Sequence, residues 1–150
     1  MLSFEGTHDF KRPPEEVWCK LRDAGFLVQC IPGVEGVACQ DRDRAACKIR
    51  PQFAFVHGSL DVTIQASDIR IGTSALITIL SKGIGATSEI EAKFSLAVQE
   101  TGTRLNWSAE IKQLGGLLKA IPQGLVKASA QNVIEEMLTN VEAKLLNDHG

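Results

Sequence analysis

The hydrophobic pattern of the chain changes its period close to Gly115. Between residues 34 and 113, apolar and polar positions mostly alternate, which predicts β-strands. From Gly115 to Asn147, large apolar residues instead recur every four positions, which predicts one long amphipathic helix. The apolar positions of this helix are Leu117, Ile121, Leu125, Val133, Met137, Val141 and Leu145. A lone long helix must bury such a stripe, and the sheet that precedes it is the natural partner.

Three of the strands alternate cleanly, with one apolar and one polar face each. This pattern is typical of an antiparallel sheet that is covered on a single side. The apolar positions are Leu60, Val62 and Ile64, then Ile90, Ala92, Phe94, Leu96 and Val98, then Leu105, Trp107, Ala109 and Ile111. The predicted strands cover residues 3–10, 34–40, 44–56 with an interruption at Pro51, 57–67, 73–81, 86–99 and 103–113.

Two short helices are predicted between the first and second strands. Pro13-Pro14 ends the first strand, and proline is well tolerated in the first turn of a helix. Gly25 ends this first short helix, and a further turn or two runs from Phe26 into the Ile31-Pro32-Gly33 breaker. The resulting order is one strand, two short helices, six strands and a long helix. This is the order of the α+β helix-grip, or START-like, fold, in which a curved antiparallel sheet wraps around a long C-terminal helix.

The residues that set turns and helix starts resemble those of the CoxG family, named for the G subunit of carbon monoxide dehydrogenase, over essentially the whole chain. The segments that carry this resemblance are 4–6 (FEG), 14–18 (PEEVW), 31–34 (IPGV), 102–105 (GTRL) and 115–116 (GG). The resemblance implies an accessory protein, not a catalytic one, associated with molybdenum-containing carbon monoxide dehydrogenases and related hydroxylases. It also implies help in attaching the enzyme to the membrane and the handling of a hydrophobic partner such as a quinone.

Length and charge narrow the class of protein. At 150 residues the chain is the size of one domain, 1–150. A net charge of −2 without a clustered basic surface argues against nucleic acid as a partner. No apolar run approaches the roughly 20 residues of a membrane span, and the N-terminus has no basic, then apolar, export pattern. We therefore expect a cytoplasmic protein that contacts the membrane only peripherally, at its inner face, or through a partner.

No catalytic or metal-binding constellation is visible in the sequence. His8, His57 and His149 are isolated from one another and from acids at ligand spacing, so neither a metal nor another cofactor is expected. His8 lies in the apolar phase of its strand, where it is either a rim residue or a polar group that points into a cavity. The four cysteines form no CxxC pair and are expected to be free thiols. A cyclase or dehydratase, which this fold sometimes hosts, would have only His8 or His57 to work with, and the chain has no tyrosine. We therefore expect a protein that is not an enzyme.

A ligand cavity between helix and sheet is the main functional hypothesis, with an expected volume of several hundred cubic ångströms. Ala120, Gly124 and Ala128 form a row of small residues that either leaves room for a ligand or lets the helix pack closely on the sheet. Gly115, Gly116 and Pro122 weaken the helix start, which is where we place the entrance. The expected wall consists of Phe53, Phe55, Leu60, Val62, Ile64, Phe94 and Trp107, with Trp18, Phe26 and Ile31 near the mouth.

Two functions remain open at this point. The first is a binding protein for an elongated apolar molecule, a quinone or a lipid, that serves a molybdenum hydroxylase. The second is an interaction or assembly protein with a filled core that docks on a redox enzyme. The presence or absence of room between helix and sheet distinguishes them.

Overall fold

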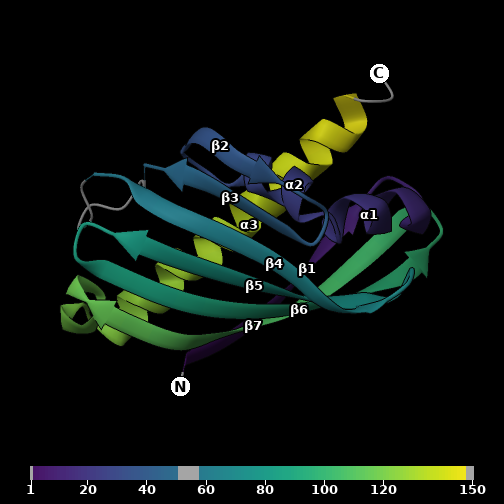
Figure 1. The fold of residues 1–150 in the computed structure, drawn as a ribbon. Helices are drawn as coiled ribbons and strands as arrows, with labels where there is room; N and C mark the ends of the chain where they lie inside the picture. Colours follow the sequence, from purple (N-terminus) through teal and green to yellow (C-terminus); the bar gives the residue numbers. More distant parts are fainter. Residues whose placement is uncertain (1, 51–57, 148–150) are drawn as a thin grey trace.

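The computed structural model describes residues 2–50 and 58–147. One sheet faces a long C-terminal helix that crosses behind it, as Figure 1 shows. The strands are β1 (Leu2–Phe10), β2 (Val34–Gln40), β3 (Arg44–Ile49), β4 (Leu60–Arg70), β5 (Ser74–Gly83), β6 (Ala86–Gln99) and β7 (Gly102–Gly116). The helices are α1 (Pro14–Leu21), α2 (Ala24–Leu27), η1 (Val28–Cys30), η2 (Leu117–Ala120) and α3 (Gln123–Asn147).

The sheet is antiparallel throughout, in the order β1-β7-β6-β5-β4-β3-β2. Successive strands from β2 to β7 are neighbours, and β1 closes the order beside β7. The predicted α+β architecture is confirmed, with a curved sheet, two short helices after the first strand and a long final helix. α1 and α2 lie near the C-terminal half of α3, whereas η2 lies at the opposite end of the sheet (Figure 1).

The predicted apolar faces form the core. Leu105, Trp107, Ala109 and Ile111 of β7 are buried, as are Leu60, Val62 and Ile64 of β4. On β6 the pattern holds less well at its end, where Val98 is 79% exposed. On α3, Met137, Val141 and Leu145 are buried, as their spacing predicts.

The predicted start of the long helix is wrong. β7 continues through Gly115 and Gly116, which pair with Thr87 and Ala86 of β6. Gly116 has a φ of +60°, a conformation that glycine adopts without strain, and there the chain leaves the sheet. Pro122 then precedes α3, and its carbonyl oxygen accepts a hydrogen bond from the Val126 N–H. The strand ladder and the proline therefore delay the helix to Gln123, so Leu117 and Ile121 do not lie on it.

Candidate functional site

A cavity of about 120 Å³ lies between the sheet and the first half of α3. Its floor comes from the inner faces of β3 to β7, and its roof comes from α3, η2 and the turn after η1. The lining residues are Ile31, Ile49, Leu60, Val62, Ile79, Ser81, Ser88, Ile90, Ile111, Leu114, Leu118, Val126, Ser129, Ala130, Val133, Ile134 and Met137. Apart from three serines, the lining is apolar, which suits a hydrophobic guest.

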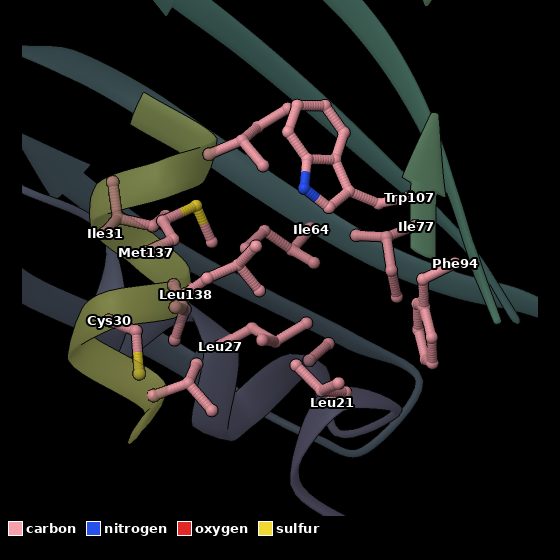
Figure 2. Packing of buried hydrophobic residues seen from close by; sticks show 14 of the residues in the cluster. Leu21, Leu27, Cys30, Ile31, Ile64, Ile77, Phe94, Trp107, Met137 and Leu138 are labelled. Atoms are coloured by element: carbon pink, nitrogen blue, oxygen red, sulfur yellow. The ribbon is translucent and has the colours of Figure 1, made fainter. Parts of the chain in front are cut away.

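A second, smaller hollow of about 60 Å³ adjoins the first. Ile79, Ile134 and Met137 line both, so these side chains separate the two spaces. Figure 2 shows Met137 and Leu138 of α3 reaching toward Ile64, Ile77 and Trp107 of the sheet. The expectation of several hundred cubic ångströms is wrong for this structure. The bulky side chains of α3 occupy most of the space between helix and sheet.

Five of the predicted wall residues line one of the two hollows. Ile31, Leu60 and Val62 line the larger cavity. Phe94 and Trp107 line the smaller one. Trp107 also packs edge-on against Phe4, with ring centroids 5.8 Å apart, and this contact holds the indole against β1.

Three other predicted residues lie outside the lining of both hollows. Ile64 is completely buried core. Trp18 is buried against Phe94 with ring centroids 6.0 Å apart, so it supports the wall from behind. Phe26 is half-buried, and the Lys20 Nζ lies 4.9 Å from the centre of its ring. Phe53 and Phe55, like His57, fall in 51–57 and so lie outside the described residues.

The row of small residues does not face the sheet. Ala120, Gly124 and Ala128 are all exposed, and a Cβ built on Gly124 would meet nothing within 4 Å. Their expected place over the cavity is wrong because Ala120 belongs to η2, not α3, and because the inner side of α3 begins at Val126. From there Ala130, Val133, Ile134 and Met137 continue the inner side along the helix.

Of the residues that line the larger cavity, the sequence interpretation named only Ile31, Leu60 and Val62, and the three serines and Ala130 are among those it missed. A signal for two of them was present, because Ser81 and Ser88 lie in the apolar phase of strands 73–81 and 86–99. The apolar stripe through Val133, Met137 and Val141 places Ser129 and Ala130, four and three residues before Val133, on the same face of the helix. The helical spacing of Leu117, Ile121 and Leu125 instead indicated a stripe that the structure does not have.

Exposed apolar side chains gather at the end of the molecule where the cavity meets η2. We call Ile84, Leu117 and Leu125 the apolar end; they are 37%, 55% and 46% exposed. The β5–β6 turn and η2 are joined by a 2.8 Å hydrogen bond from the Leu117 N–H to the Gly85 carbonyl oxygen. Leu118, next to Leu117, lines the cavity, so the apolar end borders the cavity's rim.

Exposed lysines accompany the apolar end. Lys82 precedes the β5–β6 turn and Lys119 lies in η2, whereas Lys127 of α3 lines a surface hollow beside Ser3 and Glu5 of β1. Asp61 is the ladder partner of Lys82 and forms a 3.9 Å ion pair with Lys48. The rim is therefore apolar with basic side chains beside it.

Among the titratable groups that the sequence singled out, the structure describes His8 and the four cysteines, and none of these lines the cavity. The His8 Nε2 lies 3.2 Å from the Glu142 Oε1, so His8 joins β1 to the C-terminal half of α3 instead of pointing into the cavity. All four cysteines are free. Burial raises the pKa of Cys30 and of Cys47 to about 11, so both thiols stay protonated at neutral pH. Within residues 2–50 and 58–147, no three His, Cys, Asp or Glu side chains are grouped to hold a metal ion. None of the helices described there is long and apolar enough to cross a membrane.

Comparison with known protein families agrees with the architecture of this chain. The family model for CoxG, the G subunit of carbon monoxide dehydrogenase, matches residues 6–146. No curated protein matches the sequence.

Solved structures share the fold at low sequence identity. A conserved protein from Geobacillus kaustophilus is 23% identical, with a TM-score of 0.85 and coverage of 97% of this chain and 96% of its own. A START superfamily protein from Mycobacterium smegmatis is 15% identical, with a TM-score of 0.66 and coverage of 97% of both chains. The AHSA1 protein from Silicibacter pomeroyi is 15% identical, with a TM-score of 0.67 and coverage of 99% of this chain and 100% of its own. The fold is therefore START-like.

Proposed function

Since this chain belongs to the CoxG family of carbon monoxide dehydrogenase, we propose that it is a non-enzymatic accessory protein that binds a hydrophobic small molecule. The apolar cavity between the sheet and α3 is the observation that carries this proposal. A quinone or a lipid is the class of guest that such a lining favours, because each buried methylene contributes about 0.8 kcal/mol before the cost of association.

The chemistry of the lining supports binding over catalysis. The described residues around the cavity include no acid, base or thiol, and these are the groups that general acid–base and nucleophilic catalysis use. Trp107 and Phe94 give the smaller hollow aromatic lining. A planar ring would stack on such side chains in an offset or edge-on arrangement.

The first half of α3 is the element that would make room for an elongated guest. Between Gln123 and Ala128 only Val126 is buried, so this segment has few apolar contacts to lose. The second half, from Ile134 to Leu145, is held by several buried side chains. A guest entering beside η2 would displace the loosely held half and leave the rest of the core in place.

We propose that the apolar end is where the protein meets a membrane surface that carries anionic lipids. Leu117 and Leu125 would enter the boundary of the acyl chains, and Lys82 and Lys119 would lie at the level of the headgroups. Attraction between a lysine and an anionic surface contributes about 1 kcal/mol per residue close to the membrane. A guest could then move between the bilayer and the cavity without crossing water.

The small volume of the cavity favours a second candidate function. At about 120 Å³ the space is close to that of an engineered cavity that binds benzene, roughly 150 Å³. A space of this size is too small for an elongated quinone or lipid, so the core is nearly filled for such a guest. A protein with such a core would serve as an assembly factor that docks on a redox enzyme. In both candidates the partner enzyme is a molybdenum hydroxylase of the carbon monoxide dehydrogenase type.

The experiment that separates the two candidates is native mass spectrometry with organic extraction, on protein purified without detergent from its own host. A bound quinone or lipid would support the carrier and identify its cargo. Apo protein that also fails to take up quinones or lipids during titration would overturn the carrier in favour of the assembly factor. Co-purification of molybdenum hydroxylase subunits in the same preparation tests the proposed partner.

A further inference from the structure

One polar pair interrupts the apolar floor of the larger cavity. Ser81 of β5 and Ser88 of β6 are direct partners in the β5–β6 ladder, and their hydroxyl groups are hydrogen-bonded to each other. Val62 is the partner of Ser81 on one side, and Leu114 is the partner of Ser88 on the other. All four residues line the cavity, so the hydroxyl pair has an apolar neighbour on each side.

The Ser81–Ser88 pair has one hydroxyl donor that is not used in the hydrogen bond between the two residues. Each serine hydroxyl is a single donor, and the bond between the two consumes one hydrogen. Within the described part of the chain, neither hydroxyl has a second hydrogen-bond partner. A donor that faces an apolar space without an acceptor costs free energy, and a suitably placed oxygen on a guest would remove that cost.

We propose that the Ser81–Ser88 pair is the polar anchor of the cavity and selects an apolar guest that carries a hydrogen-bond-accepting carbonyl oxygen. One hydroxyl donates to the other, and the second donates to the carbonyl. The inference rests on the proposed ligand-binding function and adds a chemical class to it. Ketone, quinone and ester carbonyls meet the requirement, whereas a plain hydrocarbon chain does not.

Ser129 does not have the same role. It lines the cavity from α3, and a helical serine has the carbonyl oxygen of the residue four positions earlier within reach of its hydroxyl. The strand serines have no such local acceptor, because in an extended strand the residue four positions earlier lies about 13 Å away along the chain. The anchor therefore lies on the sheet, and the helix above it remains free to move.

The test uses two small probes of the same shape, acetophenone and α-methylstyrene, which differ in a carbonyl oxygen against a methylene group. NMR titration gives the dissociation constant of each probe for the wild-type protein and for the S81A/S88A variant. The ratio of the two constants is compared between proteins, so that the unequal water solubility of the probes cancels. The matched control is S74A/S95A, because Ser74 and Ser95 are also partners on β5 and β6, but on the outer face of the sheet.

We expect S81A/S88A to lower the preference for acetophenone about three- to tenfold, the size of one net hydrogen bond, and the control to leave it unchanged. If both probes bind and the ratio is the same in all three proteins, the anchor is wrong while the binding function stands. If neither probe binds the wild-type protein, the proposed function fails and the anchor fails with it. Should S81A/S88A unfold, S81C/S88C replaces it, because a thiol is only slightly larger than a hydroxyl and is a weaker donor.

Discussion

The Arg22 Nη2 donates a 2.8 Å hydrogen bond to the Asp43 Oδ1 and so joins the end of α1 to the turn between β2 and β3. The two side chains are unequally exposed, at 10% for Arg22 and 76% for Asp43. The second terminal nitrogen of Arg22, Nη1, is buried without a hydrogen-bond partner among the described residues. The arginine therefore depends on a single carboxylate at the surface.

Removing the carboxylate should cost more stability than removing the arginine. We expect D43N to lower the free energy of unfolding by about 1–2 kcal/mol, because it leaves a buried guanidinium without its counter-charge. Water at the exposed Asp43 position keeps this cost below that of a fully buried pair. R22M should cost less, because it removes the buried charge and its unpaired nitrogen together. Urea denaturation of both variants checks the order, and a larger loss in R22M would contradict it.

Enlarging one small residue of α3 should close the cavity. Ala130 lines it, whereas Ala128 on the same helix is exposed. We expect A130L to abolish uptake of an apolar probe with a change in stability below about 1.5 kcal/mol, since the added side chain enters existing space. A128L should bind the probe like the wild-type protein. Equal binding by both variants would show that the space above the sheet is not the binding site.

Two glycines near the start of α3 should respond in opposite directions to alanine. Gly116 has a φ of +60°, and a Cβ there would collide with the Gly85 carbonyl oxygen. We expect G116A to destabilise the protein by more than about 1 kcal/mol. Gly124 lies in the helix with open space around it, so G124A should stabilise by about 0.4–1 kcal/mol. Thermal unfolding of the two variants measures the contrast, and a shift in the same direction would refute it.

The buried thiols should make stability fall in alkaline solution. Burial raises the pKa of Cys30 and Cys47 to about 11 from an ordinary value of 9.0. Their contribution to stability is complete below pH 9 and is lost as the pH rises toward 11, because the unfolded chain ionises first. The chain has no tyrosine to titrate in this range. Unfolding temperatures between pH 8 and 11 should fall less steeply for C30A/C47A than for C19A/C39A, whose replaced thiols are exposed. Identical slopes would exclude the thiols as the cause.

Polar substitution at the apolar end should weaken contact with vesicles. We expect L117S/L125S to reduce co-sedimentation with vesicles that contain anionic lipids at least several-fold, because it removes the side chains that would enter the bilayer. V98S is the matched control, since Val98 is 79% exposed at the opposite end of β6 from η2. High salt should weaken wild-type binding by screening the lysines. Equal binding by the variant and the control would exclude the apolar end as the contact surface.

The strands could be predicted from the sequence because the alternation of apolar and polar residues in each strand indicates which of its faces is buried. The alternation from Leu105 to Ile111 requires one face to be covered, whatever covers it. The same alternation places Ser81 and Ser88 on the covered face. Ser81 and Ser88 are paired because of the register of β5 and β6, and this register cannot be derived from the spacing of residues along either strand.

The start of α3 could not be predicted from periodicity. Leu117, Ile121 and Leu125 have helical spacing, but Gly115 and Gly116 pair with β6 instead of entering the helix. Pairing with a strand that lies earlier in the chain therefore overrode the local helical pattern. This shift carried Ala120, Gly124 and Ala128 away from the cavity and brought Ala130 into it.

The sequence by itself determined the order of elements, the covered face of each strand and the apolar character of the space between sheet and helix. These properties follow from local patterning, because burial of apolar side chains acts on each segment in the same way wherever it packs. Only the tertiary structure decided how large that space is, which face of α3 roofs it and where its polar pair lies. These three properties depend on close packing between segments that are distant in the chain. Met137 and Ile134 of the helix, together with Ile79 of the sheet, line both hollows and so limit their size.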